Sequence, residues 1–277
     1  MFNNKIKLKI VISTVFVVVA MNSFISCNNK NVKREGMKIE ENEDYKKIDA
    51  VMQLMSETFK EQISIDDKEA FLQDLQYVLK IEKTYSSEEE DLYTLVDKKN
   101  TIPPTFAPHN IVKIKTNDAY VCNKDNLSLR KEAEEALREM GIAAKQDGIR
   151  LSVSSSYRSY DYQDKTFKYW CSIDGEDEAE RYSARPGTSQ HQLGTAVDFG
   201  IIDDSFAETN QSKWLLNNAY KYGWSLSFPK GYEEVTGYKW ESWHYRFIGK
   251  EACLFQKKWF NDIQQFMLEF INIWKTI

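Results

Sequence analysis

The chain has 277 residues, of which 42% are hydrophobic and 29% are charged, and its formal net charge is -5. This length and apolar content allow one domain with a substantial core, with or without a helical extension. Because the chain is acidic and has no basic run, we do not expect nucleic acid to be its partner. An anionic substrate is still compatible with this composition, since a site can be locally positive.

The first 27 residues are typical of a targeting segment. Lys5, Lys7 and Lys9 precede an apolar stretch at residues 10–21, which is shorter than the roughly 18 to 20 residues of a spanning helix. The stretch is followed by Phe-Ile-Ser-Cys27, which resembles the bacterial lipobox, where the cysteine is lipidated and becomes the first mature residue. We therefore expect a cell-envelope protein that acts outside the cytoplasm and is attached to the membrane through Cys27. A cleaved signal or an uncleaved anchor would predict the same compartment.

Two further segments precede the main domain. Residues 28–45 are polar and charged, which predicts a flexible tether. Between residues 44 and 83 apolar side chains recur at spacings of three and four, so we predict a helical hairpin over residues 46–88, with its turn at residues 64–67. The hairpin is either an added module or an N-terminal layer of the main domain, which we place at residues 89–277.

Helices and strands alternate irregularly in the main domain. Prolines indicate an irregular segment at residues 92–113, and a polar stretch at residues 172–180 indicates a surface loop over a site. We predict helices from a cap at Ser128 to Gly148 and at residues 161–170, 210–222 and 259–274. The last helix is expected to pack against the core, with membrane contact as the alternative. We predict strands at residues 149–154 and 243–248, and a loop followed by a strand at residues 194–202. There are too few β–α alternations for a doubly wound sheet. We therefore predict an α+β fold, in which helices flank a small, largely antiparallel sheet.

Two of the three histidines lie in the densest polar motifs of the chain. His191 precedes Asp198 by seven residues, and Gly194 between them allows a turn that returns Asp198 on a strand beside His191. Catalytic zinc takes three nitrogen or oxygen ligands and leaves one position for water. We therefore predict that His191, Asp198 and His244 bind zinc (Zn2+) in a cleft on the sheet. The third histidine, His109, belongs to neither motif and is expected to be structural or exposed.

Glu241 lies three residues before His244. A turn before the last strand would let its carboxylate reach a water at the metal while His244 binds the metal. A general base at this position suits catalytic zinc, which lowers the pKa of water to about 7. The alternative is that Glu241 is a surface acid.

The two motifs resemble those of the VanY-type D-alanyl-D-alanine carboxypeptidases, zinc peptidases that share the patterns SxHxxGxAxD and ExxH. Residues 189–198 match the first pattern in full and residues 241–244 match the second. Upstream, Ser-Ser156-Tyr157-Arg158-Ser followed by Gln163 resembles the SGYRS…Q segment of this family, with Ser156 where glycine is usual. The resemblance covers about residues 92–249 and leaves the hairpin and the C-terminal tail outside.

The resemblance implies a role for each matched residue. His191, Asp198 and His244 would bind the zinc, and Glu241 would be the base and proton shuttle. Arg158 would stabilise the oxyanion of the tetrahedral intermediate, with a structural ion pair as the alternative. The substrate would contact Gln163 and Ser189, and the pocket would be lined by Tyr157 and by Trp243, for which core packing is the alternative.

The function implied is a D,D-carboxypeptidase that removes the C-terminal D-alanine from peptidoglycan stem peptides. An L,D-carboxypeptidase acting on tetrapeptide stems would use the same residues. An inactive wall-binding module would be expected to have lost a ligand or the base, and a surface lipoprotein whose hairpin binds a partner is a third alternative. We expect a monomer. A disulfide between Cys122 and Cys171 is conceivable, Cys253 has no assigned partner, and without a CxxC spacing we do not expect a cysteine-based zinc site.

Overall fold

The computed structural model describes residues 42–85 and 91–277. The predicted targeting segment, the lipidation of Cys27 and nearly all of the predicted tether lie outside these residues. Within them, no helix is both long enough and apolar enough to cross a membrane.

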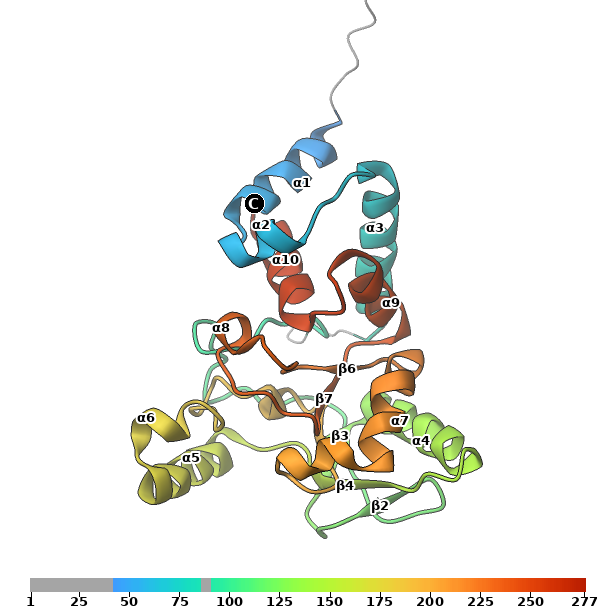
Figure 1. Ribbon diagram of the computed structural model, residues 1–277, viewed down its shortest axis with the longest axis vertical. Coiled ribbons are helices and arrows are strands. Elements are labelled where there is room, and N and C mark those ends of the chain that lie inside the picture. The colour runs from blue at the N-terminus through green and yellow to red at the C-terminus, as the bar shows by residue number, and fades with distance from the viewer. Residues whose placement is uncertain (1–41, 86–90) are drawn as a thin grey trace, which may run out of the picture. The chain divides into compact units, whose positions relative to one another are not determined.

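A five-stranded sheet lies at the centre of the part of the chain that is described (Figure 1). Its strand order is β2-β4-β5-β7-β6, and only the β2–β4 pair is parallel. The strands are β2 (Tyr120–Cys122), β4 (Leu151–Ser155), β5 (Ala196–Phe199), β6 (Trp224–Leu226) and β7 (His244–Phe247). A separate antiparallel pair joins β1 (Ile111–Lys113) to β3 (Ser128–Arg130). The predicted α+β fold with a small, largely antiparallel sheet is confirmed.

The register of the two central strands brings the two sequence motifs together. Asp198 of β5 pairs directly with His244 of β7, although the two residues are 46 positions apart in the chain. On the other side of β5, Ser155 at the end of β4 also pairs with Asp198, across an irregularity in the ladder. Directly paired residues point to the same face of a sheet, so the pairing places these three side chains together.

Helices flank this sheet. Five helices lie between β3 and β7 in the chain, and three short 3-10 helices connect other elements of the same segment. The helices are α4 (Lys131–Gln146), α5 (Tyr160–Asp174), α6 (Glu176–Ala179), α7 (Asn210–Asn218) and α8 (Glu233–Thr236), the last a single turn, and the 3-10 helices are η1 (Gln190–Leu193), η2 (Asp204–Glu208) and η3 (Ala219–Tyr222). Helix α4 contacts β2, β3 and β4 through a buried face that includes Leu137 and Met140.

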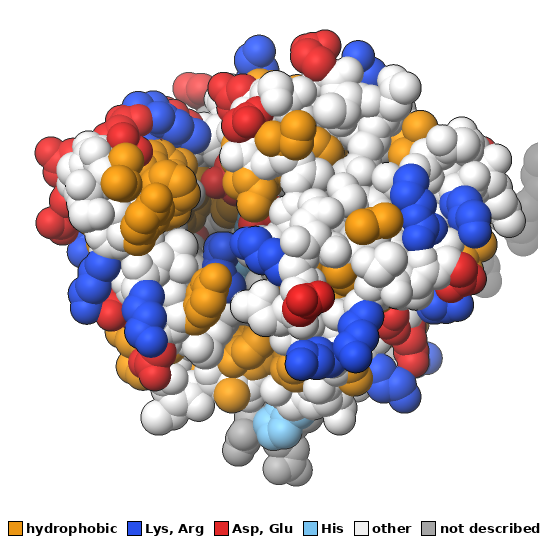
Figure 2. Space-filling model, turned by 90° about the horizontal axis from the view of Figure 1, so that it is seen from below, with side chains coloured by type: hydrophobic (Ala, Val, Ile, Leu, Met, Phe, Trp, Pro, Cys, Tyr) orange, Lys and Arg blue, Asp and Glu red, His pale blue; other side chains and the backbone are white. Residues whose placement is uncertain are grey.

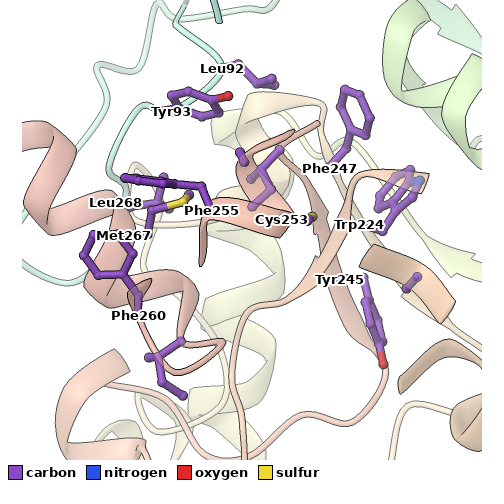
Figure 3. Close-up of a cluster of buried hydrophobic side chains, with 14 of the residues drawn as sticks. Leu92, Tyr93, Trp224, Tyr245, Phe247, Cys253, Phe255, Phe260, Met267 and Leu268 are labelled. Carbon is purple, nitrogen blue, oxygen red and sulfur yellow. The ribbon is translucent and has the colours of Figure 1, made fainter. Parts of the chain in front are cut away.

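The N-terminal helices pack against the C-terminal ones (Figure 1). These are α1 (Glu43–Leu54), α2 (Glu57–Gln62) and α3 (Lys68–Tyr85) on one side and α9 (Lys250–Trp259) and α10 (Gln264–Thr276) on the other. The ring of Phe71 on α3 lies 5.1 to 6.0 Å, centroid to centroid, from the rings of Phe255, Trp259, Phe260 and Phe270. Figure 3 shows Phe255 and Phe260 beside Met267 and Leu268 in this cluster. The C-terminal tail therefore packs in the core, and that core is continuous with the core under the sheet.

Several local predictions were wrong. The first helix of the hairpin is interrupted at Ser56, whose Oγ accepts a hydrogen bond from Phe59 N and starts α2. Ser128 does not cap a helix but belongs to β3, because extended backbone continues through Arg130. Residues 172–180 are mostly helical, and α5 and α6 are separated by Gly175 with a φ of 82°. The helix predicted at residues 259–274 begins only at Gln264, after a turn in which Asn261 and Asp262 adopt positive φ. Cys122, Cys171 and Cys253 are free thiols, so the Cys122–Cys171 bridge is not formed.

The shared aromatic core yields a stability prediction. Phe71→Ala is expected to lower the free energy of unfolding by about 3–5 kcal/mol, because it removes a fully buried ring that contacts four others. Tyr77→Ala on the same helix, where the side chain is 54% exposed, is the matched control and should change it by less than about 0.5 kcal/mol. Chemical denaturation measures both. Equal effects of the two substitutions would contradict a core shared by α3 and the C-terminal helices.

Candidate metal centre

A short 3-10 helix delivers the first histidine to the sheet. Ser189 precedes η1 and its Oγ accepts a hydrogen bond from His191 N at 3.3 Å. Gly194 ends η1 with a φ of 70°, and a Cβ at this position would lie 2.8 Å from Ile111 Cδ1. Glycine is therefore needed both for the turn and for the close packing, and the chain continues directly into β5 and Asp198.

His191, Asp198 and His244 converge on one buried point. One ligand atom from each residue lies within 4.8 Å of the others. His191 Nε2 is 3.2 Å from Asp198 Oδ2, and His244 Nδ1 is 3.0 Å from Asp198 Oδ1. The two imidazole rings are nearly perpendicular, with centroids 4.8 Å apart. The sequence therefore predicted correctly which three side chains come together.

The protonation state of His191 fits a metal ligand. Its Nδ1 lies 2.7 Å from the carbonyl oxygen of Ser156, which can only accept, so Nδ1 carries the hydrogen and Nε2 is bare. That Nε2 is buried without a hydrogen-bond partner. Burial and the nearby Arg158 charge lower the pKa of His191 to about 4, so the ring is neutral at neutral pH. A neutral imidazole nitrogen held by a backbone carbonyl on its other side is the usual form of a metal-binding histidine.

Asp198 supplies the negative charge of the group. Burial alone would raise the pKa of its carboxyl, but interactions with His191 and His244 hold that pKa well below its ordinary value. The carboxylate is therefore ionised. Two imidazole nitrogens and one carboxylate form a donor set that suits zinc and leave room for a further ligand.

Glu241 lies beside this group on a turn. Residues 242–243 form the turn that precedes β7, as predicted, and Glu241 Oε2 lies 3.5 Å from His244 Nδ1. Burial and the charge of Asp198 raise the pKa of Glu241 well above its ordinary value, against the opposing effect of Arg158. A carboxylate whose pKa is raised accepts a proton more readily than an ordinary one, which suits a general base. Glu241 is only 8% exposed, so it is not a surface acid.

Arg158 lies on the wall of the site. Its Nη1 donates to Ser155 Oγ at 3.0 Å and lies 3.9 Å from Asp198 Oδ2, while its Nε is buried without a hydrogen-bond partner. Burial lowers the pKa of Arg158, but a guanidinium remains charged at neutral pH. The contact with Asp198 is long for an ion pair, so Arg158 retains donor capacity for an anionic group.

A cavity of about 1100 Å³ opens onto these residues. Ser189 and Trp243 line it together with the metal group, Glu241 and Arg158, and Trp243 is also part of the core. Figure 2 shows the hollowed face, with hydrophobic and charged side chains gathered at the edge of the hollow. Most aromatic side chains of the cavity wall were not predicted from the sequence. They are mainly Tyr162, Tyr169, Trp170, Phe228, Tyr238 and Trp240. Three of them recur on α5, a pattern that could have signalled an exposed aromatic face.

Two predicted substrate residues do not line this cavity. Tyr157 borders a neighbouring cavity of about 240 Å³, which shares Ser155 and Arg158 with the larger one. Gln163 is fully buried and donates from Nε2 to the carbonyl oxygen of Ala184 at 2.6 Å. Gln163 therefore holds the segment that leads to His191 instead of facing the cavity. The third histidine, His109, is exposed and lies outside the metal group.

Comparisons with known proteins agree with this geometry. A family model described as "VanY: D-alanyl-D-alanine carboxypeptidase" matches residues 126–250. The YodJ protein of Bacillus subtilis is 36% identical over 170 residues, which are 59% of this chain and 62% of that protein. A D-alanyl-D-alanine carboxypeptidase of Enterococcus faecalis is 31% identical over 180 residues, which are 62% of this chain and 63% of that protein. The match thus spans less than two thirds of either curated relative.

One solved structure is similar to this chain in fold as well as in sequence. The LdcB LD-carboxypeptidase is 35% identical with a TM-score of 0.56, and the alignment covers 64% of this chain and 84% of that one. The segment that the family model matches, residues 126–250, contains both motifs and the strands that pair them. The chain belongs to the VanY family of D-alanyl-D-alanine carboxypeptidases.

Proposed function

We propose that this protein is a zinc-dependent D,D-carboxypeptidase that removes the C-terminal D-alanine from peptidoglycan stem peptides. The observation that carries the proposal is the buried, unpartnered Nε2 of His191, which faces Asp198 and His244 at the wall of a large cavity. Glu241 and Arg158 complete a set of groups suited to peptide hydrolysis. The family and the Enterococcus faecalis relative support the choice of a D-Ala-D-Ala substrate.

The side chains would divide the work as follows. Zinc, held by His191, Asp198 and His244, would supply a Lewis acid and lower the pKa of the attacking water. Glu241 would take the proton from that water at its carboxylate and deliver it to the leaving amine. Arg158 would donate hydrogen bonds to the oxyanion that develops on the substrate. Ser189, on the cavity wall, would contact the terminal carboxylate of the peptide.

The second candidate is an L,D-carboxypeptidase that acts on tetrapeptide stems, and the similarity to the LdcB structure favours it. The same catalytic groups would serve either reaction, since the difference lies in the residue that precedes the cleaved bond. Purified protein should release D-alanine from a pentapeptide stem that ends in D-Ala-D-Ala. Release from a tetrapeptide stem alone would overturn the D,D assignment and leave the chemistry intact.

We also propose that the protein acts in the cell envelope and is attached to the membrane through lipidated Cys27. Peptidoglycan lies outside the cytoplasm, and the N-terminal sequence supports export. Cys27→Ser should move the protein from the membrane fraction to the soluble extracytoplasmic fraction. An unchanged membrane fraction would exclude lipidation of Cys27 as the anchor.

The role of Glu241 can be tested by activity. Glu241→Gln removes the proton acceptor but retains the shape of the side chain, so kcat should fall by about 10² to 10⁴-fold while zinc still binds. Steady-state hydrolysis and zinc titration measure the two effects. Retention of full kcat would show that Glu241 is not the base.

Glu241→Gln should lower kcat but raise the stability of the metal-free protein. The pKa of Glu241 is raised by burial and by Asp198 in the metal-free protein, so the folded state keeps a proton that the unfolded chain has lost above about pH 4.5. The free energy of unfolding therefore falls as the pH rises above that value. Metal-free Glu241→Gln has no such loss, and its melting temperature should exceed that of the unsubstituted protein by a margin that grows toward neutral pH. A margin that does not change with pH would contradict the raised pKa.

A further inference from the structure

The second histidine of the metal group, His244, contacts a buried glutamine through the ring nitrogen that does not face Asp198. Gln190, on η1 beside His191, is 5% exposed, and its Oε1 lies 3.1 Å from His244 Nε2. The same oxygen accepts a hydrogen bond from Ser227 Oγ at 2.7 Å. His244 therefore faces Asp198 with one ring nitrogen and Gln190 with the other, and the polarity of the Gln190 amide decides which nitrogen carries the hydrogen.

That polarity is set by a chain of hydrogen bonds that begins at a backbone carbonyl. The carbonyl oxygen of Ser225 can only accept, and Gln264 Nε2 donates to it at 3.4 Å. The amide oxygen of Gln264 is thereby turned to Gln190, whose Nε2 donates to it at 3.3 Å. The amide oxygen of Gln190 then faces His244 Nε2. Each amide in the chain can donate on one side and accept on the other, so reversing one would oppose two oxygens at its neighbour.

The hydrogen on Nε2 of His244 determines the state of Nδ1, the ring nitrogen that faces Asp198. If Nε2 of His244 carries the hydrogen, Nδ1 is bare and faces Asp198 Oδ1 at 3.0 Å. Two electron-pair donors at this distance attract a cation and repel each other without one, so in the metal-free protein the hydrogen bond to Gln190 competes with the alternative in which Nδ1–H donates to Asp198. His191 also has one bare ring nitrogen, because its Nδ1–H donates directly to the carbonyl oxygen of Ser156. The two histidines would thus bind through opposite nitrogens, Nε2 of His191 and Nδ1 of His244.

This relay, the hydrogen-bond chain from the Ser225 carbonyl through Gln264 and Gln190 to His244, includes one residue outside the segment that the family model matches. That match ends at residue 250, whereas Gln264 is the first residue of α10 and is 1% exposed. The packing of α10 in the core therefore places the Gln264 amide at hydrogen-bond distance from Gln190, which contacts His244. Through Gln264, the C-terminal tail takes part in the hydrogen bonds beside the metal group in addition to packing in the core.

We propose that Gln190 and Gln264 are positioning residues that hold His244 in its Nε2–H tautomer, so that its Nδ1 is free for the metal. This inference rests on the proposed metal binding by His244 but not on the substrate. It requires neither residue to touch the metal or the peptide. Its direct prediction is the tautomer of His244 in the metal-free protein.

The tautomer can be read from nitrogen NMR of protein labelled at its three histidines. Metal-free unsubstituted protein should show His244 protonated on Nε2. Gln190→Met removes the acceptor, so the ring should shift toward the Nδ1–H form, which can donate to Asp198. Zinc affinity, measured by competition with a chromophoric chelator, should fall by about 10 to 100-fold in this variant. Gln190→Glu keeps an acceptor for His244 Nε2 and loses only the donor to Gln264, so its zinc affinity should fall by less than that of Gln190→Met.

The chain offers a matched control in the same 3-10 helix. Gln192 is also fully buried, and its Nε2 donates to the carbonyl oxygens of Pro103 and Phe106, away from the metal group. Gln192→Met should cost stability like Gln190→Met but leave the zinc affinity and the His244 tautomer unchanged. Gln264→Met should weaken zinc binding in the same direction as Gln190→Met, by a smaller factor, because Gln190 and Ser227 remain.

The outcomes separate this inference from the proposed function. Equal zinc affinities of Gln190→Met and Gln192→Met, or an Nδ1–H tautomer of His244 in the metal-free protein, would overturn the inference. Absence of zinc binding by the unsubstituted protein would overturn the proposed function, and the tautomer would still be measurable. Gln264→Met carries the test if Gln190→Met does not fold.

Discussion

The site depends on one constraint, the pairing of Asp198 with His244 across β5 and β7. The pairing sets a carboxylate against an imidazole on one face of the sheet, and η1 adds the bare nitrogen of His191 from the side. Three electron-pair donors then point at one buried position, an arrangement that is unfavourable without a cation. The tight turn at Gly194, the cap at Ser189 and the carbonyl of Ser156 all serve to keep these donors in place.

Electrostatics distinguish the roles of the charged groups. Asp198 and Glu241 are both buried carboxyls of the same cavity, yet the pKa of the first is held low by two histidines and that of the second is raised by burial and by the first. One carboxyl is thus suited to permanent charge and the other to proton transfer, as expected when neighbouring acids have divided functions. Arg158 offsets part of this negative charge without forming a close ion pair, so the metal-free site is a source of instability that a bound cation would relieve.

How far the sequence could predict this structure differs between its parts. The motifs around His191, Asp198 and His244 were predictive because residue types, spacing and a glycine all pointed to one local geometry. The strands β1, β2, β3 and β6 were missed because three residues are too few to show an alternating pattern. Gln163 and Tyr157 were expected at the substrate pocket but do not line the larger cavity, since a motif gives the position of a residue in the chain but not the direction of its side chain. The relay from Gln264 could not be read at all, because it joins residues 74 positions apart through tertiary packing.

The central claim is that His191, Asp198 and His244 hold one zinc ion, and elemental analysis of the purified protein tests it most directly. The account predicts about one zinc per chain in the unsubstituted protein, loss of that zinc in His191→Ala, and no loss in His109→Ala, where the histidine is exposed and outside the group. Unsubstituted protein without stoichiometric zinc, or His191→Ala with the metal retained, would contradict it.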